Sequence, residues 1–142
     1  MNKQIRICLD LDGTICESKS VIESYDGVCP LPGAVETMHE WKRRGYYIII
    51  QTARHMHTHK SNEGAVLATG GPILFDWLKK WDIPYDEIYF GKPHADILID
   101  DAAYTHTSWS ESARKIDDIE RHYLASPSVL YRESIHGTKF NY

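Results

Sequence analysis

Two aspartates that follow a short apolar run are the residues of this chain best suited to chemistry. Asp10 and Asp12 come at the end of an apolar stretch and are followed at once by Gly13 and Thr14. Side chains alternate along a strand, so both carboxylates point the same way if the strand continues through them. Two carboxylates roughly 4 Å apart repel each other by about 4 kcal/mol at an effective dielectric of 20. Such a pair predicts a bound cation, a proton or a reaction at the tip of the strand.

Polar side chains also follow the other predicted strands. They are Thr52 after residues 46–51, Lys92 after residues 87–90, and Asp100 and Asp101 after residues 96–99. The carboxyl ends of parallel strands lie at one edge of a sheet, where open α/β sheets bind their ligands. We therefore expect these groups to form one site with the two N-terminal aspartates.

The chemistry that suits this set is phosphoryl transfer through a carboxylate. Asp10 would be the nucleophile, and Asp12 would protonate the leaving oxygen and then activate water. Lys92 and the Thr52 hydroxyl would hold the phosphoryl oxygens in the transition state. A hard dication bound by carboxylate oxygens would offset the negative charge that gathers there.

The elements that must position these groups alternate between strands and helices. Strands are predicted at residues 4–10, 46–52, 87–90 and 96–99, and helices at 33–44, 56–69, 72–81 and from Ser108 onward. Gly70-Gly71-Pro72 is expected to separate two of the helices, and Cys8 is expected in the core. The alternation predicts an α/β fold, a Rossmann-like three-layer αβα sandwich with a mainly parallel sheet.

The motifs, taken in order, resemble the haloacid dehalogenase (HAD) superfamily of aspartate-nucleophile phosphatases. Its four motifs are similar here to Asp10-Leu11-Asp12-Gly13-Thr14, Thr52, Lys92 in Gly91-Lys92-Pro93, and Asp100-Asp101. The resemblance implies that Asp10 is the nucleophile and Asp12 the general acid and base. It also implies Mg²⁺ on the Asp10 side chain, the Asp12 backbone carbonyl and Asp100. Asp101 would bind the metal through water or would hold Lys92.

A finer resemblance concerns the substrate. Residues 52–56, 76–80 and 84–93 look like small phosphatases linked to capsular polysaccharide biosynthesis. This similarity implies a phosphorylated sugar or another small capsule precursor as substrate. Arg54 and His55 directly follow Thr52 and are expected at the substrate entrance; with them, the expected substrate-binding residues are Gly13, Thr14, Ala53, Arg54 and His55.

Length and composition limit the remaining choices. The 142 residues are read as one domain without a cap, with residues 15–32 as a flap and residues 127–142 as a tail of unassigned role. An uncapped site would accept a large substrate or use a second subunit as its lid, so a homo-oligomer is one possibility.

The formal charge of −4 disfavours nucleic acid as a partner. No apolar stretch is long enough to span a bilayer, no secretory signal is present, and three cysteines suggest reduced thiols. A cytoplasmic location is therefore expected.

Several alternatives stay open. The same chemistry would serve a nucleotidase or a phosphatase of macromolecules. A receiver-like regulatory domain also uses acids, a threonine and a lysine around Mg²⁺, but the order of these groups along this chain disfavours it. On a helix, His55 and His59 would share one face, which allows a second metal site there. The alternatives are that His55 contacts the substrate and that His57 and His59 lie on a helix face exposed to solvent.

Overall fold

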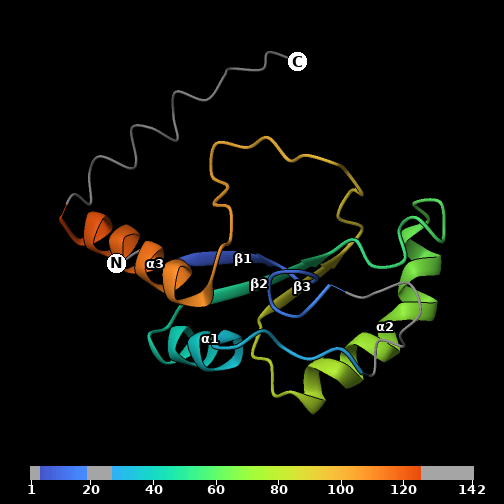
Figure 1. Cartoon of the computed structure of the whole chain (residues 1–142), viewed down its shortest axis with the longest axis horizontal. Coiled ribbons are helices and arrows are strands. Elements are labelled where there is room, and N and C mark those ends of the chain that lie inside the picture. Colours follow the sequence, from blue (N-terminus) through green and yellow to red (C-terminus); the bar gives the residue numbers. More distant parts are fainter. Residues whose placement is uncertain (1–3, 19–26, 126–142) are drawn as a thin grey trace.

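Strands and helices alternate along the chain in the computed structural model, which describes residues 4–18 and 27–125 (Figure 1). The elements are β1 (Arg6–Asp10), α1 (Ala34–Arg43), β2 (Tyr47–Thr52), α2 (Glu63–Lys80), β3 (Glu87–Phe90) and α3 (Trp109–Ala125). The predicted tail and part of the predicted flap lie outside the described residues. Within the described part, no helix has the length and apolar character that a membrane crossing needs.

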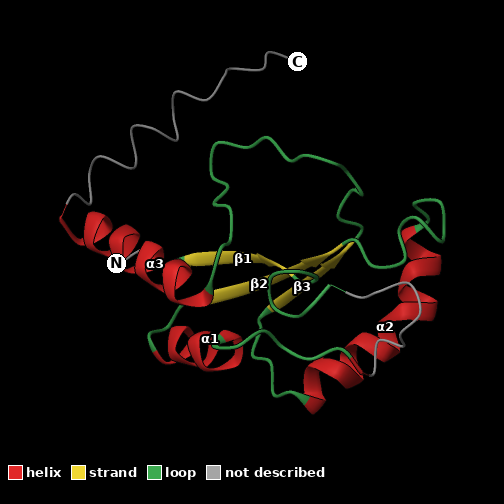
Figure 2. Cartoon of the chain, viewed as in Figure 1, coloured by secondary structure: helices red, strands yellow, loops and turns green. Residues whose placement is uncertain are grey.

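The three strands form one parallel sheet in the order β1-β2-β3 (Figure 2). Asp10 lies opposite Gln51, and Thr52 lies opposite Phe90, so all three strands end at the same edge. Figure 1 shows α1 and α3 next to each other, with α2 beside β3. The α/β class and the parallel sheet are confirmed, whereas the complete three-layer sandwich stays a prediction.

The core forms where the inner faces of the helices meet β2. Its largest fully buried side chains include Met38 and Trp41 from α1, Ile48 and Ile50 from β2, and Leu74 and Leu78 from α2. Trp41 and Trp77 are both 2% exposed and belong to this core. This packing holds the central strand in place and thereby the polar residues that follow it.

A single helix, α2, replaces the two that the sequence predicted on either side of Gly70-Gly71-Pro72. The helix begins after Asn62, whose side chain caps it by accepting the Ala65 N–H at 3.1 Å. Residues 54–61 form turns instead of helix. A Cβ added at Gly70 would lie 2.6 Å from Cδ2 of His55. Glycine therefore serves close packing of this turn against the helix here and does not end the helix.

The prediction of a fourth strand at residues 96–99 is wrong. These residues lie in the long loop between β3 and α3, where Ile97, Leu98 and Ile99 are 74%, 63% and 89% exposed. The Asp100 side chain accepts the N–H of Ala102 at 2.7 Å, and such Asx turns compete with extended strand geometry. As a consequence β1 is an edge strand of the sheet that the described residues form, and Cys8 is exposed, contrary to its predicted place in the core.

The last helix is capped at Ser108 and anchored to α1. The Ser108 hydroxyl accepts the Glu111 N–H at 3.2 Å, which caps the first turn. Arg44, at the end of α1, pairs with Asp117 at 2.6 Å and also with Glu120. The rings of Trp41 and Trp109 lie 5.5 Å apart. These contacts hold α3 against α1. The loop before α3 arches away from β1 (Figure 1).

Replacing Asp86 by Asn is expected to lower the free energy of unfolding by about 1 kcal/mol at pH 7. The Asp86 carboxylate accepts the Lys42 ammonium at 2.7 Å and the backbone N–H of Ile48 at 2.7 Å. Partial burial raises the pKa of Asp86, but the hydrogen bonds from Lys42 and Ile48 outweigh it, so the pKa lies below its usual range.

Because that pKa is lowered in the folded state, the stabilisation is present above the unfolded pKa of about 3.9 and is lost as the pH falls through the folded value. Urea unfolding of parent and variant should therefore differ at pH 7, and the difference should shrink as the pH falls below about 3.9. Asp118→Asn, which removes an exposed pair with Arg121, is the control and should change little. A difference that persists unchanged at pH 3 would contradict the assignment.

Candidate active site

The predicted nucleophile and the predicted lysine meet at the carboxyl edge of the sheet. The Lys92 ammonium lies 3.0 Å from the Asp10 carboxylate, and both side chains are partly exposed. Asp10 ends β1, whereas Lys92 follows β3, two strands away. The Lys92 N–H donates to the Thr52 carbonyl at 3.1 Å, which continues the pairing with β2 and aims the lysine back toward Asp10. A carboxylate and a cation that face solvent together are suited to receiving an anionic group.

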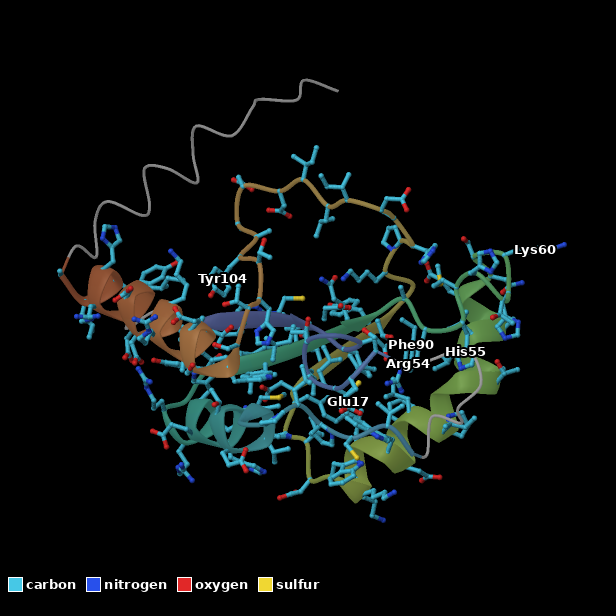
Figure 3. All side chains as sticks on the ribbon, viewed as in Figure 1. Glu17, Arg54, His55, Lys60, Phe90 and Tyr104 are labelled. Carbon is cyan, nitrogen blue, oxygen red and sulfur yellow. The ribbon has the colours of Figure 1, made fainter. Side chains whose placement is uncertain are left out.

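The predicted acid, Asp12, is held by Arg54. Arg54 Nε lies 3.0 and 2.9 Å from the two Asp12 carboxylate oxygens, and Nη2 lies 2.8 Å from Oδ1. The Asp12 side chain is 30% exposed, whereas the Arg54 side chain is 4% exposed. Figure 3 shows Arg54 between the sheet and α2. Arg54 thus reaches Asp12 from the interior and not from the solvent side.

Cys16 completes this cluster, and sequence reasoning did not find it. Its buried sulfur accepts from Arg54 Nη2 at 3.2 Å and lies 3.7 Å from Asp12 Oδ1. Burial, with the nearby Asp12 charge, raises the pKa of the Cys16 thiol to about 12, so it stays protonated at neutral pH. Nothing in the spacing of Asp12, Cys16 and Arg54 along the chain signals this contact, because it depends on how the turn after β1 closes.

The turn after β1 depends on glycine. Gly13 has φ +81°, and a Cβ there would lie 2.9 Å from the Ser18 hydroxyl oxygen. Its N–H donates to the Cys16 carbonyl at 2.7 Å, which closes the turn. Trp109 Nε1 donates to the Thr14 carbonyl at 2.9 Å and ties the turn to α3. These bonds define where Asp12 and Thr14 lie relative to the strand tip.

The remaining predicted site residues lie at the end of β2 and directly after it. Thr52 is fully buried, and its hydroxyl oxygen accepts the Arg54 N–H at 3.0 Å. Ala53 is half-buried beside it. His55 has φ +62° and packs its ring on Gly70 of α2. Contact of Thr52, Ala53 and His55 with a substrate therefore remains a prediction.

The histidines after β2 lie in two pairs. The His55 and His59 rings are 6.1 Å apart, and those of His57 and His94 are 6.0 Å apart. His59 Nε2 shares a hydrogen bond with the Thr69 hydroxyl at 2.9 Å. Across residues 4–18 and 27–125, no group of three or more His, Cys, Asp or Glu is arranged to hold a metal ion.

The predicted acidic pair of the fourth motif lies in the β3–α3 loop. Asp100 and Asp101 are both exposed, and the Asp100 carboxylate is turned to the backbone of Ala102. Asp100 nevertheless lines the same cavity as Asp10 and Lys92. The structure thus forms two separate ion pairs, Asp10 with Lys92 and Asp12 with Arg54. Asp100 lies in the wall of the cavity that Asp10 and Lys92 line, and the described residues form no three-carboxylate cluster.

That cavity has a volume of about 810 Å³ and follows the free edge of β1. At one end lie Asp10, Thr14, Lys92 and Asp100. At the other end lie apolar residues of α3, namely Ile116, Ile119 and Tyr123. A cavity of this size, lined by both charged and apolar side chains, fits a small polar ligand.

Comparisons with known proteins place the chain beside a bacterial relative. No protein-family model matches the chain, and no curated protein matches it. A solved structure from Vibrio cholerae, a structural-genomics target, is 35% identical with a TM-score of 0.67, covering 78% of this chain and 88% of that one. The chain belongs to the same family as this Vibrio cholerae protein. Membership of this family establishes the fold, and the chemistry is argued from the site.

A second solved structure is less similar to this chain. It is the D,D-heptose 1,7-bisphosphate phosphatase from B. bronchiseptica, complexed with magnesium and phosphate. The two chains are 21% identical with a TM-score of 0.46, over 84% of this chain and 64% of that one. At this level of similarity the match carries no argument about activity.

Proposed function

We propose that this protein is a phosphomonoester hydrolase of the haloacid dehalogenase type, acting through an aspartyl-phosphate on Asp10. The observation that carries the proposal is the Asp10–Lys92 pair, 3.0 Å apart at the carboxyl edge of a parallel sheet and open to a cavity. Asp12, two residues after Asp10, supplies the second carboxylate that acyl-phosphate chemistry needs for proton transfer.

The proposed reaction has two steps. An Asp10 oxygen attacks phosphorus while the bond from phosphorus to the leaving oxygen breaks, and Asp12 gives that oxygen a proton. Water then attacks the aspartyl-phosphate, Asp12 takes a proton from it, and inorganic phosphate leaves with Asp10 restored. Lys92 holds a positive charge beside the equatorial oxygens, where negative charge is concentrated in each transition state.

Mg²⁺ belongs to the proposal because several acids face an anionic substrate. The residues proposed to hold it are the Asp10 side chain, the Asp12 carbonyl and Asp100, with Asp101 through water. Asp10 and Asp100 line one cavity and offer the oxygen donors that Mg²⁺ prefers. In the described part of the chain these donors do not form a complete ligand set.

The substrate we propose is a small phosphorylated metabolite, preferably a sugar phosphate or a capsule precursor. The cavity volume of about 810 Å³ supports a small ligand, with the phosphoryl group beside Lys92 and the rest along β1. The preference for a sugar rests on the resemblance of residues 52–56, 76–80 and 84–93 to capsule-linked phosphatases. No cap domain, a cytoplasmic location and a possible homo-oligomer remain parts of the proposal.

A substrate panel tests the proposal directly. Phosphate release with Mg²⁺ is measured on sugar phosphates, nucleotides, a phosphopeptide and an oligonucleotide 3′-phosphate, each repeated with excess EDTA. We expect the highest kcat/KM on sugar phosphates and loss of activity with EDTA that added Mg²⁺ restores. Preference for nucleotides or macromolecules would replace the substrate class and keep the chemistry. A stable aspartyl-phosphate without phosphate release from any substrate would instead favour the receiver-like alternative.

A further inference from the structure

The most deeply buried charged side chain at the site is Arg54. Its side chain is 4% exposed, which is rare for an arginine unless it is paired. Its guanidinium carbon lies 5.7 Å from the centre of the Trp77 ring on α2. Nε and Nη2 are both directed to Asp12. Arg54 is therefore built into the packing behind the site, on the side opposite to an entering ligand.

The contacts of Arg54 treat the two Asp12 oxygens unequally. Oδ1 receives Nε at 3.0 Å and Nη2 at 2.8 Å, and the Cys16 sulfur lies 3.7 Å from it. Among residues 4–18 and 27–125, Oδ2 receives only Nε, at 2.9 Å. A carboxylate oxygen accepts about two hydrogen bonds. Oδ1 is thus saturated, and Oδ2 retains capacity for another partner such as a leaving oxygen or a water.

The backbone adds a second constraint on this arrangement. The Arg54 N–H donates to the Thr52 hydroxyl at 3.0 Å, so the residue is fixed directly after β2. A planar guanidinium bound through two nitrogens sets the plane of its carboxylate as well as its position. A lysine at the same place would supply the charge but not the plane.

We propose that Arg54 is a positioning residue that fixes the Asp12 carboxylate for proton transfer and does not bind the substrate phosphoryl group. This inference rests on the proposed function, and it replaces the expectation from the sequence that Arg54 lines the substrate entrance. Arg54 acts through Asp12: it holds Oδ1 and leaves Oδ2 to exchange the proton with the leaving group and then with water.

Steady-state kinetics distinguish positioning from substrate binding. For Arg54→Gln we expect kcat to fall by about 100-fold with KM unchanged, because general acid and base catalysis contributes on this scale. Arg54→Lys should recover only a small part of the loss. A rise in KM with kcat preserved would overturn the inference and return Arg54 to substrate binding. Arg44→Gln is the matched control, since Arg44 also binds two carboxylates but lies between α1 and α3, and it should keep kcat and KM.

Leaving-group dependence tests the route through Asp12. An alkyl phosphate needs a proton on its leaving oxygen, whereas a nitrophenyl phosphate needs it far less. The loss of kcat/KM in Arg54→Gln should therefore be large for the alkyl ester and small for the aryl ester. Equal losses on both esters would contradict the inference. If Arg54→Gln does not fold, as judged by circular dichroism, the same comparison is made with Arg54→Lys.

A double mutant separates this role from a purely structural one. If Arg54 acts only by placing Asp12, then Arg54→Gln should add no further loss of activity in an Asp12→Asn background. An additional loss of similar size would show that Arg54 acts independently of Asp12 and would overturn the proposal. A parent protein without phosphatase activity on any ester would instead refute the proposed function, so the two failures are distinguishable.

Discussion

Asp10→Asn is expected to abolish turnover, with kcat reduced by about 10⁴-fold or more. An amide oxygen is too weak a nucleophile to form the covalent bond to phosphorus. The substitution also removes the ion pair with Lys92, but that pair is partly exposed, so the free energy of unfolding should change by only about 0–1 kcal/mol. A large loss of activity in a protein of nearly parental stability is the combination that identifies a nucleophile.

The measurement is Mg²⁺-dependent phosphate release from an aryl phosphate, with thermal unfolding of the same samples. Asp82→Asn is the matched control. Asp82 pairs with His39 at 3.1 Å, outside the cavity, and its φ of +52° is one that asparagine tolerates. This control should keep parental kcat. Equal activity of Asp10→Asn and the parent would refute the aspartyl-phosphate route.

The parts of the site that depend on strand ends were predictable from the sequence. Asp10 and Lys92 lie on different strands, yet each follows an apolar run, and a parallel sheet brings such ends to one edge. The pattern therefore predicted that they share one site, although it did not predict the 3.0 Å contact between them. The cap at Ser108 belongs to the same class, because it depends only on residues three positions apart.

The secondary structure of segments that depend on tertiary packing was not predictable from the sequence. Gly70-Gly71-Pro72 has the composition of a helix end, but neighbouring side chains use the space above both glycines and the helix continues. Residues 96–99 have the composition of a buried strand, but the Asx turn at Asp100 and the anchoring of α3 to α1 leave them in a loop. Local propensity yields to such contacts because it is worth only a fraction of a kcal/mol per residue.

The pairing of Arg54 with Asp12 shows a third limit. The sequence placed Arg54 next to Thr52 and so near the site, but it gave no means to tell an arginine that faces the ligand from one behind the acid. The difference lies in burial, because α2 covers Arg54 through Trp77. The position of a residue at the end of a strand predicts that it lies near the site. The role of a charged residue there depends on whether its side chain faces the ligand or the core.

Lys92→Met is expected to lower kcat by about 10²–10³-fold, the scale seen when one preorganised group that stabilises transition-state charge is removed. The Lys92 ammonium lies 3.0 Å from the atom group that would bond to phosphorus, so it stands where negative charge gathers. Methionine keeps most of the side-chain volume and removes only the charge, which separates an electrostatic effect from a packing effect.

The control for this variant comes from the same cavity. Lys115→Met on α3 also removes one positive charge from the cavity wall, but toward the end formed by Ile116 and Ile119. If general attraction of an anionic substrate were the role of Lys92, both variants would raise KM alike and would differ little in kcat. If Lys92 stabilises the transition state, only Lys92→Met lowers kcat, and Lys92→Arg recovers part of it because the charge returns with altered geometry. Parental kcat in Lys92→Met would show that the 3.0 Å pair with Asp10 is structural, and the proposed mechanism would lose its source of charge stabilisation.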